Sequence, residues 1–262
     1  MLIIGERINP AGKPALAFAL RQGKTVPIQQ EAIAQERAGA QALDINIQLS
    51  DIDCADAMRK VVETIRFISP IPLVIDDQNP DILEIGLRQA GSNAFVNSPV
   101  DVEGTDVKIF SLVRAFKTDA FVLPLKQNRI AENFEEHMKL SHLLVKRFEE
   151  NGIPRKRLVI DAMLLTLKQA KSKVAETLET IKRLKSELGV RTVIGLSNLS
   201  FGLKKREKLN ARFLRLAKGC GLDAVICDPL QKEVMNAGND DAEPFTELGV
   251  KKFLEFAETC QP

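Results

Sequence analysis

Short apolar runs recur along the chain, and each is followed by a longer stretch with apolar residues at helical spacing. The runs are rich in β-branched residues and show no strict alternation with polar residues, which is typical of strands buried on both faces. The predicted strands are Leu2–Ile8, Ala42–Ile47, Leu73–Asp76, Ala94–Asn97, Ala120–Leu125, Leu158–Asp161, Thr192–Leu196 and Ala224–Cys227.

The stretches between these runs predict amphipathic helices, most clearly over Phe134–Phe148 and Val174–Leu188. Strands that alternate with helices indicate a parallel sheet covered by helices. Eight such units in 262 residues predict a closed (β/α)₈ TIM barrel, and without a visible linker we expect one domain over residues 1–262. The longest irregular stretch, Pro229–Leu248, is expected to be a helix-interrupted loop over one end of the barrel.

Polar residues gather where the predicted strands end. They include Glu6, Arg7, Asn9, Asp44, Asn46, Asp76, Asp77, Asn79, Asn97, Ser98, Asp161, Ser197, Asn198 and Asp228. In a barrel these ends meet at one mouth, where the active sites of this fold lie. Asp, Asn and Ser also favour helix N-caps, which explains Asp77, Ser98 and Asp228 at least as well as function does. Asp44, Asn46, Asp76, Asn97 and Asp161 instead lie within or at the last residue of an apolar run, where a buried carboxylate needs a partner or a ligand.

Composition narrows the chemistry that this mouth could support. The chain is 45% hydrophobic and 27% charged with a net charge of +2, so we expect neither a nucleic-acid nor a membrane partner, and a cytoplasmic protein. Its cysteines, Cys54, Cys220, Cys227 and Cys260, form no metal-binding spacing and are expected to be reduced thiols. The two histidines, His137 and His142, fall in a predicted helix. Acid–base chemistry is therefore left to carboxylates, amides, lysine and water.

Carboxylates and amides without histidine suit a flat heterocycle with several N–H donors better than a metal ion. A 2-amino-4-oxo-pteridine offers its amino group and ring N–H groups to carboxylates, and its ring acceptors to amides. By itself this composition argument leaves other ligands open.

Several stretches, in order along the chain, resemble the pterin-binding barrel family. The most similar members are the methyltetrahydrofolate:corrinoid methyltransferases and the folate domain of cobalamin-dependent methionine synthase. The stretches are Leu2–Asn9 (LIIGERIN), Gly39–Asn46 (GAQALDIN), Leu73–Asp76 (LVID), Val96–Ser98 (VNS), Leu158–Asp161 (LVID), Val193–Gly202 (VIGLSNLSFG), Leu209–Phe213 (LNARF) and Val234–Gly238 (VMNAG).

The resemblance implies a role for individual residues. Asp76, Asn97 and Asp161 match the residues that hydrogen-bond the pterin ring, and Asn198 matches an asparagine near the folate N5. We therefore expect Asn198 and Asp161 to serve catalysis. Further residues are expected to line the pterin pocket: Gly195, Ser197, Arg206, Asn9, Asp44 and Asn46. The resemblance also implies a homodimer without a metal ion of its own.

The implied reaction moves a methyl group between N5 of tetrahydrofolate and the cobalt of a corrinoid carried by a partner protein. The sequence does not fix the direction of transfer. Two alternatives stay open: a dihydropteroate synthase-like enzyme, which the loop Asn9–Pro14 disfavours, and a folate-binding accessory protein without turnover. Two departures from the family pattern concern the mouth, namely Gln48 in place of a glycine and Asp77 in place of a small residue.

Overall fold

A computed structural model describes residues 1–104, 108–168 and 173–261. Its parallel strands follow one another in chain order, and the last pairs with the first to close a barrel. The strands are β1 (Leu2–Ile8), β2 (Ala42–Asn46), β3 (Leu73–Asp76), β4 (Ala94–Asp101), β5 (Ala120–Leu125), β6 (Leu158–Asp161), β7 (Arg191–Gly195) and β8 (Ala224–Cys227). The prediction of a single-domain TIM barrel is confirmed.

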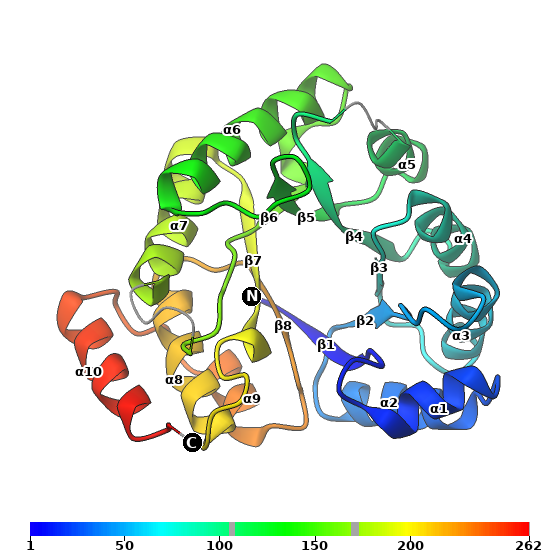
Figure 1. Cartoon of the computed structure of the whole chain (residues 1–262), viewed down its shortest axis with the longest axis horizontal. Coiled ribbons are helices and arrows are strands. Elements are labelled where there is room, and N and C mark those ends of the chain that lie inside the picture. The colour runs from blue at the N-terminus through cyan, green and yellow to red at the C-terminus, as the bar shows by residue number, and fades with distance from the viewer. Residues whose placement is uncertain (105–107, 169–172, 262) are drawn as a thin grey trace.

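Helices surround the strands on all sides (Figure 1). The α-helices are α1 (Pro14–Arg21), α2 (Val26–Arg37), α3 (Cys54–Ile68), α4 (Pro80–Ala90), α5 (Lys108–Phe116), α6 (Phe134–Glu150), α7 (Lys173–Leu188), α8 (Arg206–Gly219), α9 (Lys232–Asn239) and α10 (Glu247–Glu258). Two single 3₁₀ turns, η1 (Arg155–Arg157) and η2 (Leu196–Asn198), precede β6 and follow β7. No helix in the described ranges is long and apolar enough to cross a membrane.

Local sequence signals set where several helices begin. The side chain of Asp53 accepts hydrogen bonds from two backbone amides in the first turn of α3. The side chain of Asn79 accepts one from the Asp81 amide in the first turn of α4, which begins with Pro80. Both are favoured helix-start arrangements, since they satisfy amides that lack a partner within the helix. The helices that follow β2 and β3 therefore begin close to the strand ends that carry the polar residues.

Two apolar layers stabilise the barrel. The larger fills the space between the strands and the helices. The smaller fills the barrel interior and consists of Ile4, Ala42, Val74, Phe121, Val159, Val193 and Ala224. A barrel of this kind is packed with side chains and is not a pore. The inner layer therefore forms a floor beneath the carboxyl ends of the strands.

The observed elements differ from the predicted ones mainly in length. Strand β4 continues past Asn97 to Asp101, and the predicted loop Pro229–Leu248 contains α9, which packs against α8. Part of the remaining loop packs against the end of α8, since a Cβ on Gly219 would meet the carbonyl of Glu243. The four cysteines are unpaired.

Candidate active site

The floor of the barrel fixes which side chains enter the mouth. Side chains of a strand point alternately to opposite faces, so the residue two positions after a floor residue also points inward. On β4 the residue that packs against the floor is Phe95. The residues at the inward position above the floor are, in strand order, Glu6, Asp44, Asp76, Asn97, Leu123, Asp161, Gly195 and Ile226. Four carboxylates and one amide thus lie directly above the apolar floor, with apolar side chains only on β5 and β8.

Strand register places Asp44, Asp76 and Asn97 beside one another, together with Asn46 of β2. Asp76 is paired with Asn46 on one side and with Asn97 on the other. The Asn46 amide donates to the Asp76 carboxylate over 3.0 Å, and the Asn97 amide donates to the Asp44 carboxylate over 3.3 Å. The predicted residues on β2, β3 and β4 therefore form two hydrogen-bonded pairs. The charges of Asp44 and Asp76 couple the two pairs into one network, which keeps further acceptor sites on both carboxylates.

Burial makes these carboxylates hard to ionise. Burial raises the pKa of Asp44 well above its usual range, and the neighbouring charge of Asp76 raises it further. Burial also raises the pKa of Asp76 and of Asp161 to about 6 in each case. A ligand that donates N–H groups to ionised carboxylates would offset this desolvation. The mouth is therefore electrostatically suited to a donor-rich ligand.

Asp161 ends β6 and is held by the turn that follows. One of its carboxylate oxygens accepts a hydrogen bond from the Met163 amide over 2.8 Å. His137, on α6, is buried outside the barrel wall, and burial lowers its pKa to about 4. Its imidazole is therefore neutral at physiological pH.

Asn198 lies in η2, where its side chain folds back over the end of β7. A Cβ atom on Gly195 would lie 3.0 Å from the Asn198 amide nitrogen, and the Gly195 position faces the mouth. Glycine thus leaves the space that this amide occupies. The alternative role of a helix cap is not supported, because α8 does not begin until Arg206 and has Lys205 at its N-cap.

Glu6 also lies in the mouth. The sequence placed it among the polar residues at the strand ends, but it was not among the residues expected to bind the pterin or to serve catalysis. The Ser197 hydroxyl donates to the Glu6 carboxylate over 2.5 Å, which links β1 to the residue before Asn198. Burial raises the pKa of Glu6, although the Ser197 hydrogen bond lowers it. The signal that identifies Glu6 is its position two residues after Ile4, on the same face as the other inward carboxylates.

The remaining predicted residues lie around this centre. Arg206 is exposed and reaches back to donate to the Ser197 carbonyl over 3.2 Å. Asn9 lies at the rim, where its side chain accepts from the Ala11 amide, and the Gln48 amide donates to the Asn46 side chain. Gln48 itself is exposed. These residues hold the loops that surround the mouth.

The three residues that could equally have been helix caps do not cap helices. Asp77 accepts from the Asn79 amide over 2.7 Å within the turn before α4. Asp228 accepts from Arg7 over 2.9 Å and from the Leu230 amide. The hydroxyl of Ser98, which is buried, donates to the neighbouring Pro99 carbonyl. Their contacts are local turns and one ion pair.

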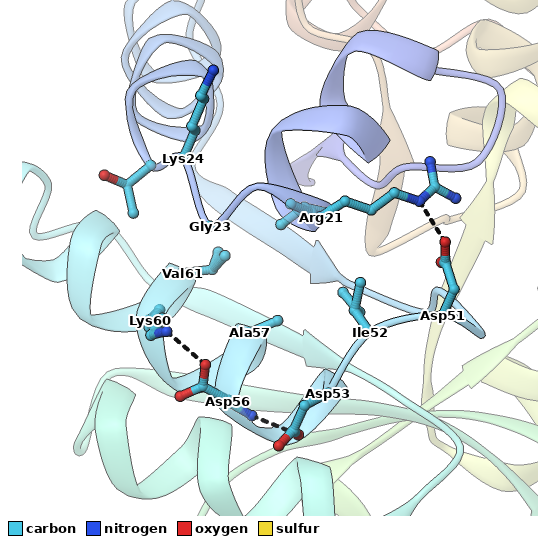
Figure 2. A pocket seen from close by; sticks show the side chains of 12 residues that line it. Arg21, Gly23, Lys24, Asp51, Ile52, Asp53, Asp56, Ala57, Lys60 and Val61 are labelled. Atoms are coloured by element: carbon cyan, nitrogen blue, oxygen red, sulfur yellow. Dashed lines mark hydrogen bonds and ion pairs between the residues drawn. The ribbon is translucent and has the colours of Figure 1, made fainter.

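One cavity borders the mouth, and a second of different character lies outside the barrel. The first, of about 430 Å³, is lined by Gln78, Pro99, Asp101, Leu123, Leu125, Asn128 and Ile130, on the wall formed by β4 and β5. The other, of about 320 Å³, lies between the α1–α2 connection and α3, outside the barrel (Figure 2). There Arg21 pairs with Asp51 and Lys60 with Asp56, each over 2.7 Å, so the charges in the second cavity largely satisfy one another.

These features define a class of barrel whose mouth presents carboxylate hydrogen-bond acceptors above an apolar floor, with the Asn198 amide beside them. In the ranges that the structure describes, no group of three or more His, Cys, Asp or Glu side chains could hold a metal ion. Such a mouth suits a planar, nitrogen-rich ring.

The chain belongs to the family of pterin binding enzymes, whose model matches residues 6–228. It is 27% identical over 252 residues to the methylcorrinoid:tetrahydrofolate methyltransferase of Eubacterium limosum, covering 90% of this chain and 88% of that protein. It is also 27% identical over 240 residues to the methionine synthase of Mycobacterium leprae, covering 86% of this chain but only 20% of that protein.

Solved structures with the same fold include two dihydropteroate synthases. One is from Coxiella burnetii in complex with pteroic acid, with a TM-score of 0.68 and 15% identity. The other is from Xanthomonas albilineans in complex with 7,8-dihydropteroate, with a TM-score of 0.67 and 18% identity. Each comparison covers 90% of both chains, and at this identity it shows a shared fold.

Proposed function

We propose that this enzyme moves a methyl group between N5 of tetrahydrofolate and the cobalt of a corrinoid carried by a partner protein. The observation that carries the proposal is the placement of the Asn198 amide over Gly195, beside the network of Asp44, Asn46, Asp76 and Asn97. This arrangement offers acceptors for a pterin ring and one hydrogen-bonding group at its edge. The name of the Eubacterium limosum relative supports the same reaction.

Different side chains in the mouth would bind different groups of the pterin ring. Asp76 and Asp161 accept from the amino group and the ring N–H groups, while the Asn97 amide meets a ring acceptor. Because both carboxylates have a pKa near 6, they are largely ionised at neutral pH and can accept these hydrogen bonds. Asp44 and Asn46 orient the carboxamide of Asn97 and the carboxylate of Asp76.

Methyl transfer from methyltetrahydrofolate breaks the N5–CH₃ bond and forms a Co–CH₃ bond. The electron pair of the broken bond stays on N5, which takes up a proton and becomes N5–H. A tertiary amine is a poor leaving group, so a hydrogen bond or proton must reach N5 by the transition state. Asn198 would supply that hydrogen bond directly or through a water that it orients, and the Ser197–Glu6 pair lies beside it as a protonatable group.

In the opposite direction, tetrahydrofolate N5 attacks the methyl group on cobalt and loses its proton through the same groups. The corrinoid is a substrate here and arrives on another protein. We also propose that the enzyme acts as a homodimer, in accordance with the family resemblance.

A direct test is an absorbance assay that mixes the purified protein with methyltetrahydrofolate and reduced free cobalamin. We expect methylcobalamin to form. The likeness to dihydropteroate synthases makes a second assay useful, in which p-aminobenzoate and a dihydropterin pyrophosphate are supplied instead. Dihydropteroate in the second assay without methylcobalamin in the first would overturn the proposal, and tight folate binding without either product would identify an accessory protein.

A further inference from the structure

A group of lysines lies at the rim of the mouth on the side of Asn198. Lys168, on the loop after β6, and Lys204 and Lys205, on the loop after β7, are all exposed. None of the three forms an ion pair with a residue in the described ranges. The nearby acid Glu207 accepts a hydrogen bond from the Glu233 amide over 2.8 Å. In a chain with a net charge of only +2, this is a local excess of positive charge.

Backbone hydrogen bonds connect the two loops that carry these lysines to Asn198 and its neighbour Leu199. The Phe201 amide donates to the Asn198 carbonyl over 3.2 Å, and the Leu167 amide donates to the Leu199 carbonyl over 3.0 Å. The ammonium of Lys168 lies against Gly202, since a Cβ there would be 2.7 Å from its nitrogen. The loops after β6 and β7 therefore form one surface that runs from Asn198 outward.

Phe201 is the aromatic residue on this surface, and 69% of it is exposed. It is separated from Asn198 by one hydrogen-bonded turn and is followed within four positions by Lys204 and Lys205. The ring of Phe201 lies between Asn198 and the lysine ammonium groups. This arrangement favours a ligand in which an aromatic group follows the reacting end and carboxylates follow the aromatic group.

We propose that this surface, defined by Phe201, Lys168, Lys204 and Lys205, binds the p-aminobenzoylglutamate tail of the folate and favours folates with a γ-linked polyglutamate chain. The inference rests on the proposed function. The tail is attached at C6, the atom next to N5, so a pterin with N5 at Asn198 directs its tail past that residue. The p-aminobenzoyl ring then meets Phe201, and the glutamyl carboxylates meet the lysines.

The test compares the affinities of 5-methyltetrahydrofolate monoglutamate and triglutamate by calorimetry. Two exposed ion pairs strengthen binding by roughly twofold to thirtyfold, so the triglutamate should bind more tightly by that factor. The preference should shrink at high salt, because exposed charges are screened. The double variant K204E/K205E should lose the preference, while its affinity for the monoglutamate changes less.

A matched control is K251E/K252E, which makes the same charge change at exposed positions on α10. It should keep the preference for the triglutamate. Lys205 is the N-cap of α8, and Lys204 is the residue before it. The helix dipole favours a carboxylate at these positions, so K204E/K205E should fold normally. K168E, on the other loop, provides a second variant that should also weaken the preference.

Equal affinity of the wild-type protein for the two folates would overturn this inference and leave the proposed function intact. Failure to bind the monoglutamate or to form methylcobalamin would instead remove the proposed function. If K204E/K205E keeps the preference but slows transfer to a protein-bound corrinoid, the lysines serve a partner protein and the inference is wrong.

Discussion

Asn198 owes its place in the mouth to the glycine three residues before it. The position of Gly195 faces inward, and any larger residue there would press on the Asn198 amide. A carboxamide does not titrate near neutral pH, so in the proposed reaction Asn198 contributes a hydrogen bond that strengthens as charge develops on N5. Interactions made only in the transition state raise the rate without tightening substrate binding.

Replacing Asn198 by alanine should therefore damage the chemical step. We expect single-turnover methyl transfer to slow by about 10²–10⁴-fold, with a much smaller change in folate affinity and an unchanged melting temperature. Stopped-flow absorbance, calorimetry and thermal melts measure the three quantities. A variant that melts early but transfers methyl at nearly the normal rate would show that Asn198 is structural.

Asp161 should matter for binding instead. Its carboxylate is buried and keeps acceptor sites beyond the Met163 amide, so Asp161→Ala would leave ligand donors unpaired. A hydrogen bond to a charged group contributes roughly 1.5–3 kcal/mol, which corresponds to about tenfold to over a hundredfold in affinity. Calorimetry with methyltetrahydrofolate measures this loss, and an unchanged dissociation constant would refute the role.

At the scale of elements, the site depends on how closely the helices approach the strands. Gly86 of α4 packs on β3, and a Cβ at this position would lie 2.5 Å from a side-chain carbon of Ile75. Ile75 is the residue before Asp76. The absence of a side chain on the helix thus lets α4 approach the strand that carries a candidate pterin-binding carboxylate.

We expect Gly86→Ala to destabilise the protein although alanine is the better helix former. Overpacking costs typically about 1–3 kcal/mol, while the gain in helix propensity is about 1 kcal/mol. Urea unfolding measures the difference, and folate affinity should fall as β3 shifts. Gly91→Ala is a useful comparison, because nothing lies within 4 Å of a Cβ there and its φ of 74° is the only obstacle. A stabilised Gly86→Ala variant would contradict this account.

Periodicity predicted the strands well but not where β4 ends. The predicted strand ends at Asn97. In the structure β4 pairs with β5 as far as Asp101, while its pairing with β3 ends at Asn97. Beyond Asn97, β4 has no hydrogen bonds to β3 for Pro99 to interrupt, so the strand continues alongside β5. This depends on the tertiary pairing of the strands, which the local sequence does not show.

The site shows the same division between local and distant information. Asp44, Asp76, Asn97 and Asp161 could be predicted because each lies within or at the last residue of an apolar run, and the register of the strands then brings three of them together. The contact between Ser197 and Glu6 could not, because 191 positions separate the two residues and only barrel closure makes them neighbours. The role of Gly195 likewise depends on where another side chain lies.

At the scale of the whole molecule, the raised pKa values make stability depend on pH. Asp76 and Asp161 bind a proton more tightly in the folded protein, with a pKa of about 6, than in the unfolded chain, where it is about 3.9. The unfolding free energy that they contribute is therefore highest below about pH 4 and is lost as the pH rises through about 6. Burial of Asp44 acts in the same direction.

Comparison with Asp161→Asn isolates one of these carboxyl groups. The unfolding free energy of the wild type, relative to the variant, should fall by on the order of 3 kcal/mol between about pH 4 and pH 7 in the absence of folate. Urea titrations across this range measure it. A difference that does not change with pH would show that Asp161 titrates normally.

The proposed homodimer is also a property of the whole molecule. Light scattering at micromolar concentration should give twice the 29.0 kDa mass of the chain. A mass equal to that of one chain would contradict the proposal without affecting the assignment of the mouth.

The apolar floor of the barrel also has a kinetic consequence. Because Ile4, Val74, Phe121 and their neighbours close the interior in the part of the barrel that the structure describes, a ligand on the barrel axis reaches the carboxylates above this floor through the mouth. A folate seated against the carboxylates lies beneath whatever approaches it from outside. In the proposed reaction the folate must therefore bind before the corrinoid protein docks, and the folate product can leave only after that protein has departed. The two substrates are thus bound and released in a fixed sequence, and dissociation of the larger one limits exchange of the smaller.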